Sequence, residues 1–334
     1  MQTSAAKSPR VIVVDRENPD AAALEEAALV LRRGGLVAFP TETVYGLGAR
    51  ALDAASIRRI FEAKGRPPAH PIIAHVSGET QATLLAAEWS PLASKLARAF
   101  WPGPLTIVTP KKNHVPLELT GGGDTVGIRA PSHPVARALL LAFGEPIAAP
   151  SANRFQEVSP TRAAHVVKSL GTRVDLVLDG GRADRGIEST VVAIENETRI
   201  VVLRPGSITP RDLRAFGDVV VEARNAESGA MRMSPGLDAK HYAPRARLVL
   251  ASRAEMLSAI GEAKHAAAIF IGKKAEIGAA ETRELPADAS GFAAALFVTL
   301  HDLDDAGCDM VVVEAPPDSE EWLAVRDRLT RAKS

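Results

Sequence analysis

Residues 36–48, LVAFPTETVYGLG, place a short apolar run directly before a polar, glycine-rich stretch. The run at 36–39 predicts a buried strand, and the stretch at 40–49 predicts a connection without regular structure. A helix is expected on either side of this unit. The helix before it closes at Gly34, and the helix after it begins behind the N-cap candidate Asp53.

Further apolar runs predict the remaining strands of the first domain. They lie at 71–76, 105–109, 125–129, 146–149, 174–178, 189–194 and 199–203. The last two lie too close together for a crossover helix, so they are expected to pair as a hairpin. Helical patterns fall between only some of the others. We therefore expect the first domain, residues 1–212, to be an α/β unit with a mixed sheet.

The segment 213–246 contains a long stretch without periodicity, which is typical of a linker or a functional loop. Beyond it, strands and helices alternate, and this predicts a small, parallel, Rossmann-like α/β domain over 247–334. Its strands are expected at 248–251, 267–271 and 310–314, and its helices near 253–263, near 291–306 and from Ser319 onward.

The charge balance excludes a globally basic nucleic-acid binder. Lysine and arginine total 40, aspartate and glutamate total 40, and aromatic residues make up only 4% of the chain. The single cysteine, Cys308, excludes disulfide scaffolds and multi-cysteine metal sites and is typical of a reducing compartment. Because no signal-like or membrane-spanning apolar segment is present, we expect a cytoplasmic protein.

The chain contains no complete copy of the common phosphate-binding motifs. It has no GxxxxGK[ST] motif, and the stretch 46–51, GLGARA, lacks the rest of a dinucleotide-binding unit. A plain glycine turn is the favoured interpretation of that stretch.

Two other segments combine residue types that bind anions. Lys64 ends the helix behind Asp53, and Arg66 follows in a turn fixed by two prolines. Ser151 and Asn153 come directly after a predicted strand, so both side chains can point at one ligand. Taken alone, the lysine is explained by the helix dipole and the Ser–Asn pair by an ordinary turn. Their joint occurrence is what favours a phosphate or carboxylate site.

A series of ordered motifs resembles one known family. LVAFPTETVYGLG, KGRPPAHPIIAHV, WPGPLTIV, VGIRAPSHP, APSANRFQEVSPT, GIESTVV and LRPGSI follow one another as in the YrdC-like domain of threonylcarbamoyl-AMP synthases. The resemblance spans residues 21–210 and includes the KxR and SxN signatures of that family. SPGLDAKHYAP and the α/β tail behind it resemble the long, two-domain form of the enzyme.

The resemblance implies a nucleotidyltransferase. L-threonine, bicarbonate and ATP would give L-threonylcarbamoyl-AMP, pyrophosphate and water, the first step in forming the threonylcarbamoyladenosine beside the anticodon of tRNA. It further implies Mg²⁺ held mainly through ATP phosphates, and a product passed to the tRNA threonylcarbamoyl-transferase machinery. Neither stable nucleic-acid binding nor a membrane is implied. The sequence offers no convincing nucleophile triad and no HExxH zinc site, and the implied chemistry needs neither.

The resemblance also assigns roles to single residues. Lys64 and Arg66 are the expected catalytic residues, facing the carbamate and the phosphates. ATP is expected to contact Lys64, Pro68, Thr125, Ser151, Asn153, Ser159, Arg204 and Tyr242. L-threonine is expected to contact Thr41, His75, Arg129, Ala149 and Ser189. A guanidinium at position 129 could grip the threonine carboxylate through two hydrogen bonds.

Several of these residues also have ordinary structural explanations, which the sequence leaves open. His75 ends an apolar strand and could be a satisfied core histidine. Arg204 could be a surface cation at a strand end, and Thr41 and Ser189 could be turn or cap residues. Tyr242, in the predicted linker, could belong to a packed crossing between domains or to a lid over the nucleotide.

The chain departs from the family pattern at two places. His70 stands where an asparagine is common, and the linker reads GLDAKHY where a bulkier, more basic stretch is usual.

A competing hypothesis is a non-catalytic RNA-binding protein that uses the same domain surface, with Arg58, Arg59, Lys64 and Arg66 as a local basic patch. A carbamoyl-transfer relative of the hydrogenase-maturation type would carry cysteine-rich fingers, and the single cysteine excludes it.

Overall fold

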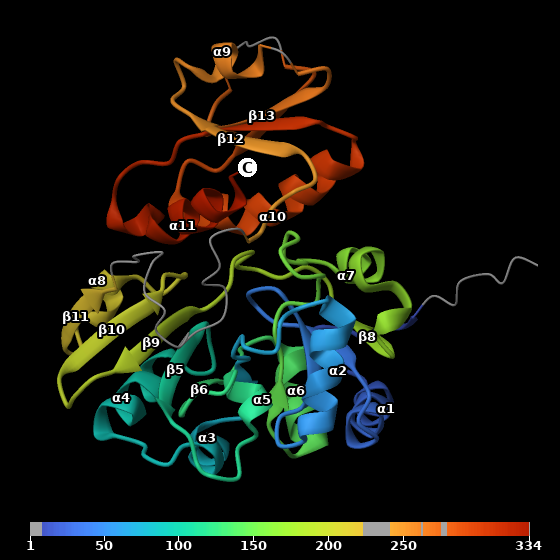
Figure 1. The fold of residues 1–334 in the computed structure, drawn as a ribbon, viewed down its shortest axis with the longest axis vertical. Coiled ribbons are helices and arrows are strands. Elements are labelled where there is room, and N and C mark those ends of the chain that lie inside the picture. Colours follow the sequence, from blue (N-terminus) through green and yellow to red (C-terminus); the bar gives the residue numbers. More distant parts are fainter. Residues whose placement is uncertain (1–8, 223–240, 262, 275–278, 334) are drawn as a thin grey trace, which may run out of the picture.

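The computed structural model describes residues 9–222, 241–261, 263–274 and 279–333, which form two sheets with helices packed on them (Figure 1). Over these residues the larger sheet has eleven strands, and parallel and antiparallel neighbours both occur in it. The predicted mixed sheet is therefore confirmed. In spatial order its strands are β1 (Arg10–Val13), β8 (Leu176–Asp179), β2 (Val37–Pro40), β3 (Tyr45–Arg50), β7 (Ile147–Ala148), β4 (Ala74–His75), β6 (Thr125–Arg129), β5 (Leu105–Pro110), β9 (Thr190–Ile194), β10 (Arg199–Arg204) and β11 (Asp218–Val221).

The helices of this domain begin and end at recognisable cap residues. The side chain of Asp53 accepts a hydrogen bond from the backbone N of Ser56 over 3.1 Å, and Gly65, with a φ of 63°, ends the same helix. The helix predicted behind Asp53 is thus confirmed. The helices are α1 (Ala21–Arg32), α2 (Ala54–Lys64), α3 (Glu79–Leu85), α4 (Pro91–Phe100), α5 (Leu117–Thr120), α6 (Pro134–Phe143), α7 (Ala163–Leu170) and α8 (Pro210–Leu213), with a 3₁₀ turn at Gly171–Arg173.

The prediction of an irregular connection at 40–49 was wrong for its second half, because β3 begins at Tyr45 and continues to Arg50. β3 pairs antiparallel with β2 on one side and with β7 on the other, and its residues are almost all buried. A Cβ atom on Gly48 would lie 2.8 Å from Phe39 and 2.9 Å from Ile147. The glycine therefore makes room for side chains of neighbouring strands and forms no turn. A strand buried on both faces shows no polar alternation, so periodicity could not identify it.

The second sheet has four strands within the described residues, all parallel, as predicted. In spatial order they are β12 (Arg247–Ala251), β15 (Met310–Glu314), β13 (Ala266–Ile271) and β14 (Glu281–Leu285). The helices are α9 (Met256–Ile260), α10 (Ala289–Asp305) and α11 (Leu323–Ala332), with a 3₁₀ turn at Glu320–Trp322. β14 escaped prediction because its sequence, ETREL, is polar. β11 lies inside the segment predicted as a linker, and residues 223–240 of that segment lie outside the described residues.

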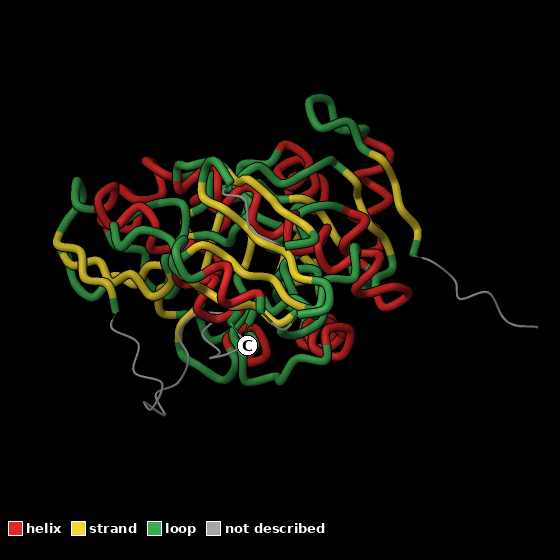
Figure 2. The backbone as a smooth tube through the Cα atoms, turned by 90° about the horizontal axis from the view of Figure 1, so that it is seen from above, coloured by secondary structure: helices red, strands yellow, loops and turns green. Residues whose placement is uncertain are grey.

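The two domains meet along α10 and α11, which lie on the side of the small domain that faces the larger one (Figure 1). Seen from above, the small domain covers the central part of the larger one (Figure 2). Val44, Val158 and Ile187 of the large domain pack into one apolar cluster with Phe292 and Phe297 of α10. No helix in the described ranges is both long and apolar enough to cross a bilayer.

Candidate active site

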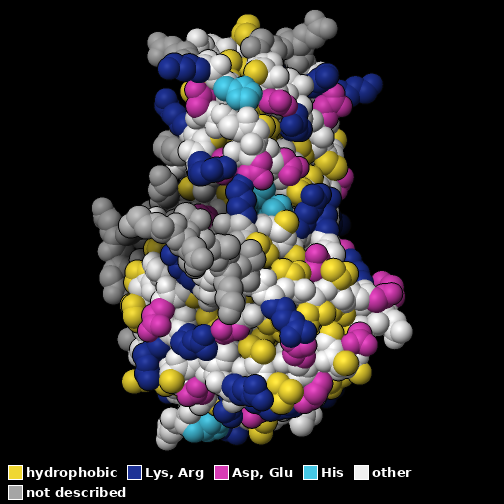
Figure 3. Space-filling view, turned by 90° about the vertical axis from the view of Figure 1, so that its right-hand side faces the viewer, with side chains coloured by type: hydrophobic (Ala, Val, Ile, Leu, Met, Phe, Trp, Pro, Cys, Tyr) yellow, Lys and Arg dark blue, Asp and Glu magenta, His cyan; other side chains and the backbone are white. Residues whose placement is uncertain are grey.

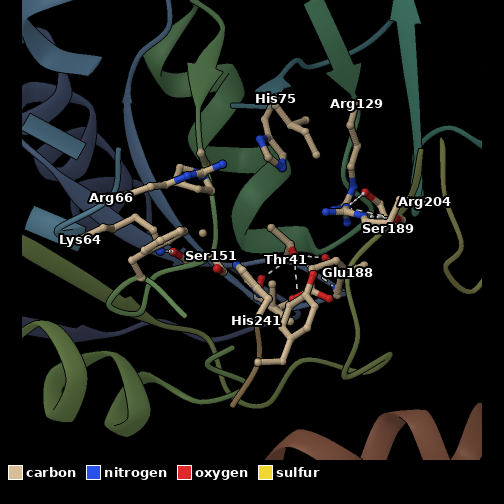
Figure 4. Close-up of a pocket in the computed structure, with 18 residues that line it drawn as sticks. Thr41, Lys64, Arg66, His75, Arg129, Ser151, Glu188, Ser189, Arg204 and His241 are labelled. Atoms are coloured by element: carbon tan, nitrogen blue, oxygen red, sulfur yellow. Dashed lines mark hydrogen bonds between the residues drawn. The ribbon is translucent and has the colours of Figure 1, made fainter. Parts of the chain in front are cut away.

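One pocket at the centre of the large sheet brings most of the predicted residues together (Figure 4). All five residues expected to contact L-threonine line it, as do Lys64, Arg66, Ser151, Arg204 and Tyr242. The full lining is Thr41, Thr43, Val44, Gly46, Lys64, Arg66, Ile73, His75, Arg129, Ala149, Pro150, Ser151, Phe155, Glu188, Ser189, Arg204, His241 and Tyr242.

Four predicted residues are not part of this lining, and they differ in position. Asn153 and Ser159 are buried directly behind it, where Asn153 accepts hydrogen bonds from Lys64 and Ser159 donates one to Glu188. Thr125 begins β6 opposite Pro110. Pro68 is exposed in the turn after α2. The structure thus places Asn153 and Ser159 against the pocket wall and leaves the other two outside it.

Lys64 joins the end of α2 to the loop behind β7. Its Nζ donates to the backbone oxygens of Ser151 and Asn153 and lies 3.4 Å from Oδ1 of Asn153. The side chain is 4% exposed. Burial, and next the charge of Arg66, lower the pKa of Lys64 well below its ordinary value. The KxR turn and the SxN loop are therefore in direct contact through this ammonium group.

Thr41 closes the turn between β2 and β3. Its hydroxyl donates to the backbone oxygen of Val44 over 2.6 Å, and its Oγ1 accepts from the backbone N of Thr43 and of Val44, each over 3.2 Å. A threonine that bonds to the backbone two and three residues ahead is typical of tight polar turns. The turn holds Thr41, Thr43 and Val44 against the pocket.

His75 and Arg129 sit side by side at the ends of the parallel strands β4 and β6. Burial, and next Arg129, lower the pKa of His75 to about 3, so its imidazole is neutral at physiological pH. Its Nδ1 is buried without a hydrogen-bond partner among the described residues. The interpretation of His75 as a satisfied core histidine is therefore wrong, because an unpartnered polar atom lies beside the pocket.

Arg129 forms a buried ion pair with Glu42, which the sequence did not single out. Nη2 of Arg129 donates to Oε1 of Glu42 over 2.7 Å, and Nε donates to the backbone oxygen of Gly103 over 3.3 Å. Oε2 of Glu42 accepts from the backbone N of Ser132 over 3.1 Å. These contacts fix the guanidinium in one orientation at the edge of the pocket.

Ser189 and Arg204 lie next to Arg129, across the pocket from Lys64 and Arg66 (Figure 4). Nη2 of Arg204 donates to the hydroxyl of Ser189 over 3.1 Å and to its backbone oxygen over 3.0 Å. The same hydroxyl lies 2.8 Å from that of Thr106 on β5. Arg204 is 3% exposed, so the interpretation as a surface cation is wrong, and burial lowers its pKa to about 10.

Tyr242 follows the segment 223–240 and lies against both domains. It is 1% exposed, its φ is 61°, and its ring stacks on Phe297 of α10 with 5.5 Å between ring centroids. A left-handed backbone is rare for a tyrosine, which indicates that packing holds it in place. Residues 223–240, the part of the predicted lid that precedes Tyr242 and His241, lie outside the described residues.

The electrostatics of the pocket suit ligands with several negative charges. Lys64 and Arg66 of the KxR turn, Arg129 of β6 and Arg204 of β10 all line it, and Glu188 is the carboxylate among the lining residues. Burial alone would raise the pKa of Glu188, but the neighbouring Arg328 and Arg204 bring that pKa below its ordinary value. The pocket can therefore bind phosphates and carboxylates in a site largely shielded from water.

The local basic patch proposed for RNA binding is absent from the described surface. Arg58 pairs with Glu118, Arg59 pairs with Asp175, and Lys64 and Arg66 are buried. On the face shown in Figure 3, basic and acidic side chains are interspersed. This face therefore offers no single-signed surface for a nucleic-acid backbone.

Sequence reasoning missed three residues that the structure adds to the site. Glu188 stands next to the predicted Ser189, and Glu42 is the one acidic residue of the motif at 36–48, so each had a signal in the sequence. The helical spacing of Arg328 from Ala324 and Ala332 placed it on a buried face, but nothing in the sequence connected it to the site. His70, which replaces the common asparagine, lies 3.0 Å through its Nδ1 from the backbone oxygen of Pro67, and its ring packs on Phe155.

Comparisons with known proteins agree over both domains. Residues 29–206 match the family model Sua5_yciO_yrdC, described as telomere recombination. Residues 208–334 match the family model Sua5_C, described as the C-terminal domain of threonylcarbamoyl-AMP synthase.

Full-length relatives share this organisation. A threonylcarbamoyl-AMP synthase of Pyrococcus abyssi is 38% identical over 96% of this chain and 97% of its own length, and one of Bacillus subtilis is 36% identical over 96% of each. The crystal structure of P. abyssi Sua5 complexed with L-threonine superposes with a TM-score of 0.90 at 37% identity, covering 96% of this chain and 97% of the other.

Proposed function

The chain belongs to the threonylcarbamoyl-AMP synthase family, and we propose that its pocket joins L-threonine, bicarbonate and ATP into L-threonylcarbamoyl-AMP, pyrophosphate and water. One observation carries this proposal: four cations from three segments, the KxR turn, β6 and β10, line one pocket. A triphosphate, an amino-acid carboxylate and a carbamate are all anions that need placed cations. The relative solved with L-threonine supports threonine as the amino acid.

The reaction needs two bond-forming steps. The threonine amine forms a bond to the carbon of bicarbonate, water leaves, and a carbamate results. A carbamate oxygen then attacks the α-phosphorus of ATP, and the bond to pyrophosphate breaks with its electron pair on the leaving group. Neither step requires a covalent bond to the protein. The pocket's task is therefore to position the reactants and to neutralise negative charge as it develops.

The threonine half of the pocket lies around Arg129. Its guanidinium is fixed by Glu42 and Gly103, so a carboxylate can bind without first ordering a mobile arginine. The hydroxyl of Ser189 is held by Thr106 and Arg204 and faces the same space. Neutral His75 offers a ring nitrogen to an uncharged amine or a hydroxyl. Thr41 and Ala149 complete this half by lining it.

The nucleotide half lies around Lys64 and Arg66. Both would face the phosphates and the carbamate, and a bound triphosphate would restore the charged form of a lysine whose pKa burial has lowered. Ser151 lies in this half, since its backbone oxygen accepts a hydrogen bond from Lys64, and Arg204 and Tyr242 line the same pocket. Asn153 and Ser159 would act from directly behind the lining. Direct contacts by Pro68 and Thr125 remain expectations from the family resemblance.

We propose that Mg²⁺ arrives with ATP. Within the described ranges, no group of three or more histidine, cysteine or carboxylate side chains could hold a metal ion. The carboxylate of Glu188 already accepts hydrogen bonds from Ser159 and Arg328. These residues fit an ion that phosphate oxygens hold and that neutralises their charge. Chelation should stop pyrophosphate release, and added Mg²⁺ should restore it.

Downstream, the product would pass to the machinery that transfers the threonylcarbamoyl group to tRNA, in the cytoplasm. The mixed anhydride between a carbamate and a phosphate is reactive, so a transferase must accept it promptly. On the face shown in Figure 3, the interspersed charges favour transfer to another enzyme over stable tRNA binding there.

The reactants can be tested one at a time. Purified protein should release pyrophosphate from ATP only when L-threonine and bicarbonate are both present, and mass spectrometry should identify threonylcarbamoyl-AMP as the nucleotide product. Pyrophosphate release that is unaffected by leaving out threonine would contradict the proposal. Lys64→Met should remove most of the threonine-dependent activity without abolishing folding.

A further inference from the structure

Arg328 reaches from the small domain to the back of the pocket in the large one. It lies on α11 and is 0% exposed, the largest of the fully buried side chains in the described part of the chain. Nε donates to Oε2 of Glu188 over 2.8 Å, and Nη1 donates to the backbone oxygen of Pro205 over 3.0 Å. Glu188 lines the pocket and Pro205 directly follows the pocket residue Arg204.

Glu188 in turn contacts Ser159, a further residue of the site. Oε1 of Glu188 accepts a hydrogen bond from the hydroxyl of Ser159 over 2.6 Å, so both carboxylate oxygens are engaged. The backbone oxygen of Ser159 in turn lies 3.1 Å from Nε2 of His301 on α10. Two helices of the small domain thus fix Ser159, one through Glu188 and one directly.

The same guanidinium also packs on Tyr242. Its central carbon lies 5.3 Å from the centroid of the tyrosine ring, a cation–π geometry. Tyr242 has a left-handed backbone and is stacked from another side by Phe297. The arginine therefore holds a residue that faces the pocket in a conformation which a tyrosine rarely adopts.

We propose that Arg328 is a positioning residue for the nucleotide, which holds Glu188, Ser159 and Tyr242 in the arrangement that ATP binds. This inference rests on the function proposed above. Arg328 does not line the pocket, so it acts through the residues that it contacts. All three routes, through Ser159, through the backbone beside Arg204 and through Tyr242, end at residues expected to contact ATP. The threonine side depends on it less, because Thr106 of β5 independently holds the hydroxyl of Ser189.

A purely structural role as a link between domains is the alternative. Other ion pairs connect the same two domains away from the pocket, and they provide matched controls. Arg214 behind α8 pairs with Glu320 over 3.0 Å, and both side chains are substantially exposed. If Arg328 only joined the domains, replacing either arginine would loosen the interface without distinguishing between the substrates.

The test uses the full chain and four variants: Arg328→Met, Arg328→Lys, Glu188→Gln and the control Arg214→Gln. KM for ATP and KM for L-threonine are measured by pyrophosphate release, and ATP affinity is measured by calorimetry without threonine. We expect Arg328→Met to raise the KM for ATP at least tenfold and the KM for threonine less than threefold. Arg214→Gln should leave both within twofold.

Two of these variants, alone and combined, keep the proposal testable if Arg328→Met fails to fold. Arg328→Lys keeps the charge but cannot bond to Glu188 and Pro205 while stacking on Tyr242, so the KM for ATP should still rise about fivefold. The double variant with Arg328→Lys and Glu188→Gln should have a KM for ATP close to that of the single variants. Both substitutions break the same contact, the one between Arg328 and Glu188. Unchanged ATP affinity in folded Arg328→Lys would overturn the proposal, as would equal rises in both KM values. If the unmodified chain releases no threonine-dependent pyrophosphate, the proposed function fails instead, and ATP calorimetry still tests Arg328.

Discussion

Arg129 and Glu42 form an ion pair of 2.7 Å in which each side chain is only 4% exposed. The arginine expected to bind the threonine carboxylate therefore already has an anionic partner inside the protein. Glu42 is in turn fixed by the backbone N of Ser132. A buried pair of this kind contributes little net stability, but breaking it leaves an uncompensated charge. In this site, the ion pair fixes the orientation of the Arg129 guanidinium.

Glu42→Gln should therefore weaken threonine binding more than ATP binding. We expect the KM for L-threonine to rise about tenfold and the free energy of unfolding to fall by about 3 to 5 kcal/mol. Steady-state kinetics and denaturant unfolding measure these changes. Glu145→Gln is the matched control, because its pair with Arg50 is partly exposed, and it should cost less than about 1 kcal/mol. An unchanged threonine KM in Glu42→Gln would show that Arg129 needs no such support.

Lys64→Met should remove most turnover while the fold survives. The change deletes an ammonium group expected to face the phosphates and keeps the length of the side chain, so kcat/KM should fall by about 10² to 10³. The backbone oxygens of Ser151 and Asn153 lose their donor, which should lower the free energy of unfolding by no more than about 2 kcal/mol. Lys168→Met, at an exposed lysine on α7, serves as the control. Near-normal turnover would refute the assigned role.

We expect a stacked histidine pair to make the stability of the domain interface sensitive to acid. His165 of α7 and His301 of α10 lie with ring centroids 3.9 Å apart. Burial, then His301 and the nearby Arg162 and Lys168, lower the pKa of His165 to about 3. The unfolded chain, with a histidine pKa of about 6.5, binds a proton that the folded chain does not. The neutral His165 therefore costs the folded state no stability above pH 6.5. As the pH falls from 6.5 toward 3, proton binding to the unfolded chain lowers the free energy of unfolding.

His165→Phe should reduce that dependence, because phenylalanine can stack on His301 without titrating. Unfolding free energies measured between pH 6.5 and 4 should fall less steeply in the variant, by up to about 1.4 kcal/mol per pH unit. His114→Asn, at an exposed histidine, provides the comparison. Identical slopes for the variant and the parent would assign the acid sensitivity to other groups.

Gly48→Ala should destabilise the centre of the large sheet. The added Cβ would lie 2.8 Å from Cε1 of Phe39, 2.9 Å from Cγ2 of Ile147 and 3.1 Å from the backbone oxygen of Val37. Overpacking of this kind costs about 1 to 3 kcal/mol, which denaturant unfolding can resolve. Gly78→Ala, where no heavy atom lies within 4 Å of the new Cβ, should change stability by less than about 0.5 kcal/mol. Equal effects at both positions would contradict the packing argument.

The sequence was sufficient to associate the KxR and SxN signatures, because each carries residue types that bind anions. It could not supply their physical connection, in which the Nζ of Lys64 bonds to backbone oxygens 87 and 89 residues away. Backbone acceptors leave no trace in side-chain composition. The strand β3 was missed for a related reason, since its glycines are explained by neighbours on β2 and β7 that only the folded sheet brings close.

Helical spacing places Arg328 on the buried face of α11, but it does not reveal what the arginine contacts. Ala324, Val325, Leu329 and Ala332 lie on the same face and are buried. Arg328 pairs with its neighbour Asp327 and with Glu188 of the other domain, 140 residues away in the chain. A buried charge is tolerated only when it is paired, and the contact with Glu188 becomes visible only when both domains are assembled.

The bonds from Lys64 to the loop at 151–153 bear on how this protein can be re-engineered. The last turn of α2 and that loop form one mechanical unit, since the backbone N of Phe155 also donates to the oxygen of Lys64 over 2.9 Å. In a chimera that carries this loop from a distant relative, the backbone oxygens that Lys64 contacts would lie at different positions. A loop exchange should therefore replace the end of α2 together with the loop.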